Sequence, residues 1–212
     1  MNLYAPPGAE ALADARRRLV ELDPVLGPLH AAVPSFEWRI RPSGFLGLAR
    51  MIVEQQVSVA SAAAIWGRLQ ARLGEVTPEA VLALPPEDLL GCGLSRPKQR
   101  YLLALAEAGV DFGPLRGLED DDAIAVLTGL KGVGRWTAET YLMFCEGRPD
   151  VFPAGDVALQ EAMRWADGLE VRPGEKAAYA RAERWRPYRG VAAHLLWGGY
   201  RALRRGELVS AT

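Results

Sequence analysis

The chain has 212 residues, of which 50% are hydrophobic and 24% are charged, and its formal net charge is −1. This composition predicts one compact domain or two small lobes that share a core. Two cysteines, Cys92 and Cys145, are too few for a four-thiolate iron–sulfur or zinc site, and no apolar run reaches the ~18 residues of a transmembrane helix. We therefore expect a cytoplasmic protein of the bacterial type, without an iron–sulfur cluster and with no membrane partner.

Helical periodicity dominates the chain, and we find no convincing strand. Residues 11–22 form an amphipathic candidate and 24–33 a shorter one. From Phe45 to Gln56 apolar residues recur at i, i+3, i+4, i+7 and i+8, which predicts a helix with Ser43 as its cap. Gly74 ends the next helix, 59–73, and Thr77 with Pro78 starts another that Pro85–Pro86 breaks. The remaining helices are expected at 96–108, 120–128, 134–146, 156–165, 175–184 and 187–205, which makes the fold class all-α.

The charge is distributed unevenly along the chain. Residues 172–205 contain nine Lys/Arg and two Asp/Glu, whereas 86–122 contain four basic and eight acidic residues. The basic segment could face an anion while the whole protein stays near neutral. A solvated helix face is the alternative interpretation.

The stretch LKGVGRWTAET, residues 130–140, places Gly132 and Gly134 before a helix. It follows a predicted helix rather than a strand and lacks a third glycine, which excludes the dinucleotide fingerprint, and it does not fit the Walker pattern. A helix, a tight hairpin and a second helix remain, with Leu130 under the turn and Val133 at its tip. Main-chain N–H groups at the glycines and at the helix start would bind a phosphate. A plain turn between two helices is the alternative.

This stretch resembles the helix–hairpin–helix of the DNA glycosylase superfamily that carries a Gly/Pro loop and a catalytic aspartate. Further segments match that superfamily in its order, at Ile52–Ser58, Gly93–Lys98 and Val151–Asp156, and Trp185–Trp197 resembles its 3-methyladenine DNA glycosylase II branch. The resemblance implies one domain over 1–212 with two helical lobes and an active-site cleft between them. The central bundle with the hairpin would span 45–150, and the terminal helices 1–44 and 151–212.

The resemblance implies a monofunctional base excision repair enzyme that flips alkylated bases, 3-methyladenine above all, out of duplex DNA and leaves an abasic site. Asp156 would be the catalytic carboxylate, which stabilises a positively charged sugar; its position before a helix equally fits an N-cap. Relatives that also cut the backbone carry a lysine where this chain has Trp136. A glycosylase for oxidised or deaminated bases and a non-catalytic DNA-binding module remain the alternatives.

The resemblance also assigns the surfaces that would bind DNA. Trp136 and Trp197 match base-pocket positions, with a role as core tryptophans as the alternative, and Tyr141 and Trp38 are weaker pocket candidates. His30 and His194 fit no catalytic pattern and are expected to be structural. Arg96 matches the wedge that fills the gap left by the flipped base, with Ser95 beside it. Gln55, Gln56 and Ser58 would orient the loop or touch the opposite strand, and buried hydrogen bonding at the helix junction is the alternative. The other expected DNA-binding residues are Lys131, Gly132, Val133, Gly134, Arg135 and Thr137.

Two expectations concern ligands and assembly. The carbonyls of Thr128, Leu130 and Val133 match those that hold a monovalent cation, Na⁺ or K⁺, in relatives, while no cofactor is required. The expected partner is double-stranded DNA with damaged bases, bound by a monomer.

Overall fold

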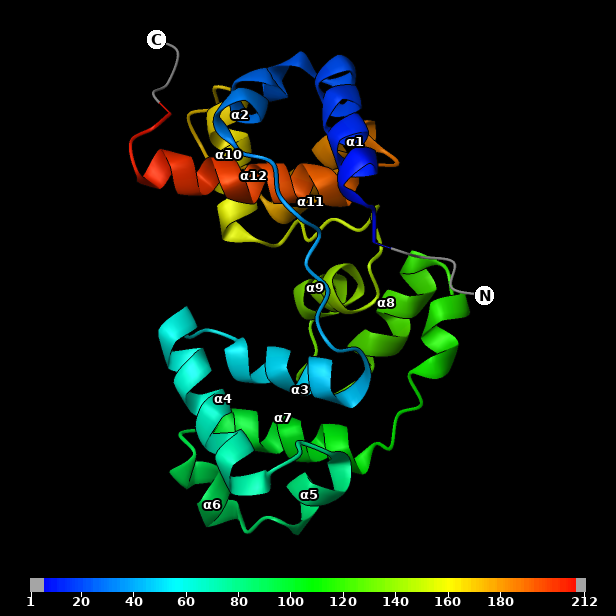
Figure 1. The fold of residues 1–212 in the computed structure, drawn as a ribbon, viewed down its shortest axis with the longest axis vertical. Helices are drawn as coiled ribbons and strands as arrows, with labels where there is room; N and C mark the ends of the chain where they lie inside the picture. The colour runs from blue at the N-terminus through cyan, green and yellow to red at the C-terminus, as the bar shows by residue number, and fades with distance from the viewer. Residues whose placement is uncertain (1–5, 209–212) are drawn as a thin grey trace. The chain divides into compact units, whose positions relative to one another are not determined.

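The structure, a computed structural model, describes residues 6–208. Within this range the chain forms twelve α-helices and three 3₁₀ helices and no strand, as the all-α prediction requires (Figure 1). No helix among these residues has the length and apolar character needed to cross a membrane. The chain divides into two compact units: a central unit, residues 41–141, and a terminal unit made of 6–40 and 142–208.

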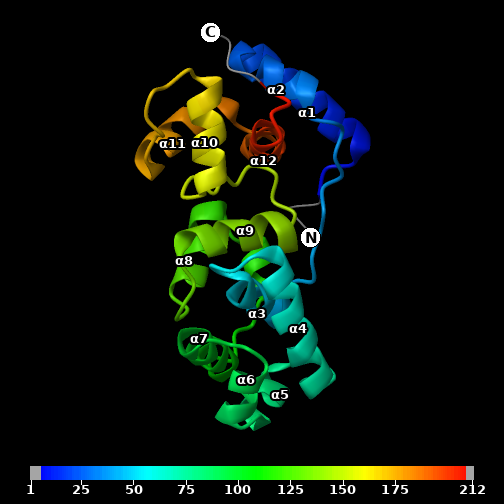
Figure 2. The same ribbon diagram turned by 90° about the vertical axis from the view of Figure 1, so that its left-hand side faces the viewer.

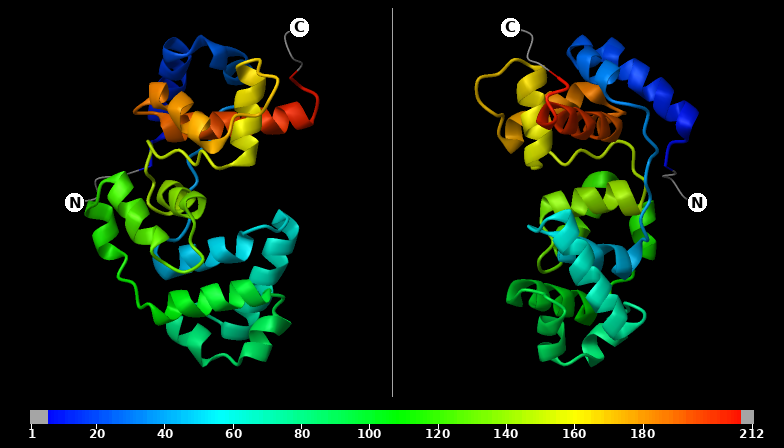
Figure 3. Two further views of the ribbon diagram at one scale, coloured as in Figure 1. Left: turned by 180° about the vertical axis from the view of Figure 1, so that it is seen from behind. Right: turned by 60° about the vertical axis from the view of Figure 1, so that its left-hand side comes forward.

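The central unit is built around α3 and α7, which pack side by side (Figure 1). The apolar periodicity read from the sequence is the buried face of α3, where Leu48, Ile52 and Val53 are fully buried. Helices α5 and α6 pack on α7 (Figure 3). The helices of this unit are α3 (Gly44–Glu54), α4 (Val59–Leu73), α5 (Pro78–Ala83), α6 (Pro86–Gly91), α7 (Arg96–Glu107), the 3₁₀ helix η2 (Gly113–Gly117), α8 (Asp120–Thr128) and the first part of α9 (Arg135–Cys145).

The terminal unit is built around α12, which packs against α10 and α2 (Figure 2). Gly199 lets α2 approach closely, because a Cβ there would lie 2.4 Å from a methyl carbon of Leu29. The helices of this unit are α1 (Ala9–Leu22), η1 (Pro24–Leu26), α2 (Gly27–Ala32), α10 (Val157–Ala166), α11 (Glu175–Ala182), η3 (Glu183–Trp185) and α12 (Arg189–Arg204).

The boundary between the units falls within α9, after Tyr141, earlier in the chain than the boundary near residue 150 expected from the resemblance. The reason is local packing: the indole Nε1 of Trp38 donates to the carbonyl oxygen of Met143 at 3.0 Å, so the end of α9 belongs with the terminal unit.

One local prediction needs correction and another is confirmed. Ser43 occupies the N-cap position of α3 but its hydroxyl makes no cap bond; the Gly44 N–H donates instead to the Tyr141 hydroxyl at 2.7 Å. The helix that Thr77 and Pro78 start does end before Pro85–Pro86, at Ala83. The sequence reading missed only that a further short helix, α6, follows at once, with Pro86 as its first residue, where its missing N–H has no intrahelical partner to lose.

Candidate functional site

The hairpin of the central unit connects α8 to α9 through residues 129–134. Two backbone bonds close it, from Leu130 N to Leu127 O and from Val133 N to Leu130 O, both 3.1 Å. Gly132 adopts a left-handed backbone with φ of +87°. A Cβ at this position would lie 2.2 Å from the ring of Tyr101 on α7, so glycine is required both by conformation and by space.

Gln55, the residue directly after α3, hydrogen-bonds to the hairpin. Its amide Nε2 donates to the Gly132 carbonyl and to the Thr137 hydroxyl, both at 3.1 Å. Both hydrogens of the amide are therefore used inside the protein, which fits the alternative that Gln55 orients the loop by hydrogen bonding at the helix junction and not the DNA contact. The next residue, Gln56, is exposed and has a φ of +53°, an uncommon conformation for a residue with a side chain.

A hollow of about 530 Å³ opens beside the hairpin, within the central unit. Trp136 borders it and is 40% exposed. The residues that line the hollow are Gln55, Gln56, Tyr101, Thr128, Leu130, Gly132, Val133, Gly134, Trp136 and Thr137.

The three residues of the predicted cation site, Thr128, Leu130 and Val133, all line this hollow. The Leu130 carbonyl accepts the bond from Val133 N and keeps a second lone pair. Carbonyl oxygens are ligands that suit a monovalent cation, so the residues present fit the expected group.

The surface of the hairpin differs in part from the prediction. Lys131, Gly134 and Arg135 are exposed, as a DNA contact requires. Val133 is not at an exposed tip: its side chain is buried, because the turn folds it toward the apolar interior, and the Thr137 hydroxyl is likewise buried against Gln55. Their side chains cannot serve the expected contact, and the Val133 N–H is already used in the bond to Leu130.

The charge of Arg135 is largely matched inside the protein. Its Nε donates to the buried carboxylate of Glu139 at 3.0 Å, and Asp121 lies 3.7 Å from its Nη2. The hairpin therefore offers backbone donors and the Lys131 ammonium more than it offers a free guanidinium, as expected for phosphate binding at a helix start.

The other two loops singled out in the central unit are exposed. Ser95 and Arg96 lie on the surface at the start of α7, and Lys98 anchors this end because its buried ammonium donates to the Val53 carbonyl at 2.7 Å. Ser58 is exposed too, but its hydroxyl accepts a bond from Ser61 N and so caps α4.

In the terminal unit, Asp156 begins α10 after the loop Val151–Gly155. Its Oδ1 accepts the N–H of Ala158 at 2.8 Å and that of Leu159 at 3.1 Å, so the predicted N-cap is present. The loop folds back on itself through a bond from Asp156 N to Pro153 O. The carboxylate is half-buried and held in one orientation.

Sequence reasoning missed Gln160, one helical turn after Asp156. Its amide donates to the carbonyl of Ala154 at 2.7 Å, in the same loop. The spacing of four residues was the available signal, because it places Gln160 on the same face of α10 as the aspartate.

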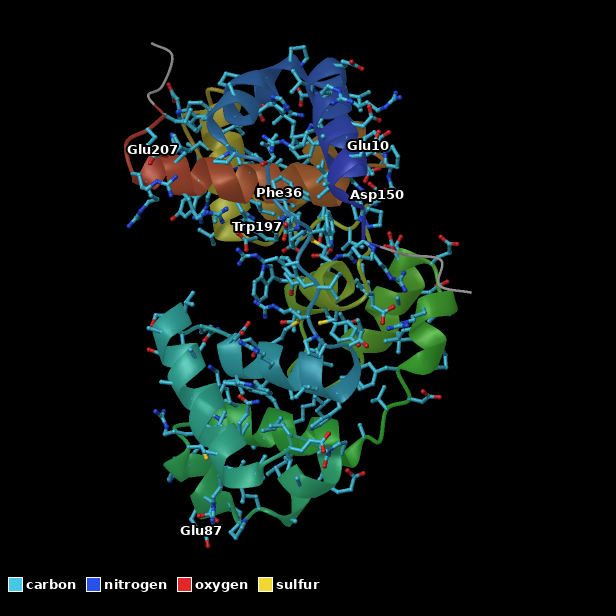
Figure 4. All side chains as sticks on the ribbon, in the orientation of Figure 1. Glu10, Phe36, Glu87, Asp150, Trp197 and Glu207 are labelled. Carbon is cyan, nitrogen blue, oxygen red and sulfur yellow. The ribbon has the colours of Figure 1, made fainter. Side chains whose placement is uncertain are left out.

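The predicted pocket aromatics divide into partly exposed and buried rings. Trp197 is half-buried and stacks near Phe144, with ring centroids 5.8 Å apart (Figure 4). Trp38 and Tyr141 are buried, and each uses its polar atom in a bond to backbone. The structure therefore gives these two residues packing roles in place of the expected contact with a base.

His194 completes the aromatic group around Trp197. Its ring stacks on Phe36 at 4.9 Å and meets Trp197 edge-on at 5.7 Å. Burial, reinforced by the positive charges of Arg201 and Arg39, lowers the pKa of His194 from 6.5 to about 4, so the imidazole is neutral at pH 7.

This shift predicts a pH dependence of stability. Between pH 6.5 and 4 the unfolded chain binds the proton that the folded chain excludes, so stability falls as pH drops through this window. We expect urea titrations to show that wild type loses about 3 kcal/mol more than His194→Phe over this range. His30 is present in both proteins, so its contribution cancels in the difference between them. Equal dependence of the unfolding free energy on pH in wild type and His194→Phe would contradict the prediction.

Five of the nine basic residues of the segment 172–205 take part in ion pairs with acids of the terminal unit. Arg181 pairs with Asp23 and Asp167, while Arg186 and Arg189 both pair with Asp150. Arg172, Lys176, Arg201 and Arg204 take part in no salt bridge within the described residues, so the interpretation of this segment as an anion-binding face stays a prediction that only these four side chains could serve.

A hairpin closed by glycine between two helices, with backbone donors at the second helix, defines the helix–hairpin–helix class of DNA-binding proteins. Residues 49–187 match the model of the HhH-GPD superfamily of base excision DNA repair proteins. The chain belongs to this superfamily.

Solved structures agree with this assignment. The crystal structure of a DNA-3-methyladenine glycosidase from Bacillus halodurans is 33% identical, covers 90% of this chain and 91% of its own, and has a TM-score of 0.79. The 3-methyladenine DNA glycosylase Mag1 of Schizosaccharomyces pombe, in complex with abasic DNA, is 28% identical, with coverages of 94% and 99% and a TM-score of 0.75. A relative from Bacillus subtilis is 28% identical over 71% of this chain, which spans 56% of that relative's length.

Proposed function

We propose that this protein is a monofunctional glycosylase of base excision repair that removes alkylated bases, 3-methyladenine above all, from duplex DNA. The observation that carries the proposal is the carboxylate of Asp156, held by two helix N–H groups after the loop Val151–Gly155. The names of the relatives from Bacillus halodurans and Schizosaccharomyces pombe support the substrate class.

The chemistry needs a negative charge beside the sugar. A base inside the duplex is out of reach, so the nucleotide is first flipped out of the stack. Loss of the base leaves positive charge on the sugar, and a fixed carboxylate stabilises that charge without reorganising. Asp156 supplies this carboxylate and orients the water that attacks the sugar carbon.

Trp136 decides between hydrolysis and backbone cleavage. A Schiff base with the sugar needs an amine, and an indole has none. The nearby Lys131 precedes Gly132 and is exposed, where it meets a phosphate rather than the reacting carbon. The product is therefore an intact strand with an abasic site.

In this proposal the flipped base stacks on an indole. The two candidates are the exposed Trp136 of the central unit and the half-buried Trp197 of the terminal unit. A purine nucleotide methylated at N3 or N7 carries a positive charge on the base. Stacking on indole then gains cation–π energy of about 0.5–2 kcal/mol over a neutral base. This difference favours alkylated purines over oxidised or deaminated bases.

The DNA itself is held by the hairpin. The N–H groups at the start of α9 bind a phosphate. The carbonyls of Thr128, Leu130 and Val133 would hold a monovalent cation, which would supply positive charge beside that phosphate. Arg96 fills the space of the flipped base. The protein acts as a monomer on double-stranded DNA in the cytosol.

The test is a single-turnover base-release assay on duplex DNA methylated at purines. We expect release of 3-methyladenine, and sites that break only after alkali. Unmethylated duplex and duplexes with uracil or 8-oxoguanine are the controls. Release from the 8-oxoguanine duplex alone, or nicks without alkali, would overturn the proposal; DNA binding with no release from any duplex would indicate a binding module.

A further inference from the structure

The side-chain amides of glutamines donate hydrogen bonds to the backbone of three loops: the hairpin, the loop before α7 and the loop before Asp156. Three of the five glutamines in the chain donate Nε2 to a backbone carbonyl: Gln55 to Gly132 in the hairpin, Gln99 to Leu94 before α7, and Gln160 to Ala154 in the aspartate loop. A neutral amide is the suitable group, since it supplies N–H donors without adding charge beside a phosphate or a carboxylate.

Gln160 ties the aspartate loop to the helix that the aspartate caps. The side chain is buried, with 7% exposure, and the Ala154 it holds is fully buried. The 2.7 Å bond therefore lies away from solvent, where an unmade bond would leave the Ala154 carbonyl without compensation. Asp156 is anchored to the first turn of α10 by its carboxylate, and Gln160 anchors the preceding loop to the next turn.

Gln55 joins two points on either side of the start of α9. One hydrogen of its amide bonds the Gly132 carbonyl before the helix, and the other bonds Thr137 in its first turn. The peptide between Gly132 and Val133 is held at its other end by the Val133 N–H bond to Leu130. The orientation of the N–H groups at the start of α9 relative to the hairpin therefore depends on Gln55.

We propose that Gln160 is the positioning residue for Asp156 and that Gln55 is the positioning residue for the phosphate-binding hairpin, and that neither side chain touches DNA. The assignment rests on the proposed function. If so, the two residues affect different quantities: Gln160 governs the rate of bond cleavage, and Gln55 governs the affinity for DNA.

The experiment measures both quantities on Gln160→Met and Gln55→Met, with Gln70→Met on the exposed face of α4 as the matched control. We expect Gln160→Met to lower the single-turnover rate at saturating enzyme about 10- to 100-fold with little change in Kd, since a small displacement of a reacting group is costly. Gln55→Met should raise Kd about tenfold, with a smaller salt dependence, and leave the saturated rate near that of wild type.

We expect one variant to lose rate and the other to lose affinity. A general loss of stability would not give this result, because unfolding lowers the rate and the affinity together. Thermal unfolding of each variant identifies that case; if Gln160→Met does not fold, Gln160→His, which keeps an N–H donor, should retain the wild-type rate. A wild-type rate in Gln160→Met, or equal effects of the two Met variants on both quantities, would overturn the assignment alone. Absence of base release by wild type would overturn the proposed function and the Gln160 assignment with it. The Gln55 assignment would still be tested by the Kd for DNA, and an unchanged Kd in Gln55→Met would overturn it.

Discussion

Asp156→Asn should lower the single-turnover rate of base release about 100- to 1,000-fold while the protein stays folded and binds DNA as tightly as wild type. Asparagine is as good an N-cap as aspartate. Its side-chain oxygen can still accept the N–H groups of Ala158 and Leu159, so the start of α10 keeps both bonds. The negative charge is what disappears, and it acts only when positive charge develops on the sugar.

Two further variants separate charge from capping. Asp156→Ala loses the cap as well and should cost about 1 kcal/mol of stability, with the same loss of rate as the asparagine variant. Asp122→Asn, at an exposed acid in the first turn of α8, is the matched control and should match wild type in rate. A rate in Asp156→Asn within threefold of wild type, measured by quench-flow on methylated duplex, would remove Asp156 from the chemistry.

The sequence predicted this part of the site because its signals are local. An aspartate before an amphipathic run indicates a cap, and the cap is present. Thr77 before Pro78 gave the same kind of signal, and its hydroxyl accepts the N–H of Ala80 at 3.2 Å. Gly132 placed the hairpin for a similar reason, since the left-handed backbone it adopts is one that glycine takes without strain.

The sequence could not predict contacts between segments that are far apart in the chain. Gln55 reaches Gly132 across 77 positions, and no periodicity in either segment indicates the pair. Tyr141 was expected to face a base, yet its hydroxyl meets Gly44, 97 positions away. Helical periodicity gives the apolar face of a helix but not which remote segment covers it, so the burial of Trp38 and Tyr141 required the structure.

Gly132→Ala should destabilise the central unit by about 2–5 kcal/mol and abolish tight DNA binding. Alanine in a left-handed conformation costs about 1–2 kcal/mol, and a Cβ at 2.2 Å from the Tyr101 ring adds the cost of an overpacked core. The hairpin can relieve the contact only by moving away from α7, which strains both bonds of Gln55. Urea unfolding and a DNA titration measure the two effects.

The neighbouring glycine provides the contrast. Gly134 has nothing within 4 Å of the position of a Cβ and no left-handed backbone, so Gly134→Ala should change stability by less than about 0.5 kcal/mol. It should still weaken DNA binding, because the added methyl group occupies the space through which a phosphate approaches the start of α9. In Gly132→Ala with Tyr101→Ala, the steric part of the loss should be recovered and the conformational part should remain, so the two substitutions are not additive. Additive losses would mean that Tyr101 does not limit the hairpin, and a Gly134→Ala variant with wild-type Kd would mean that the phosphate does not approach along the backbone at that residue.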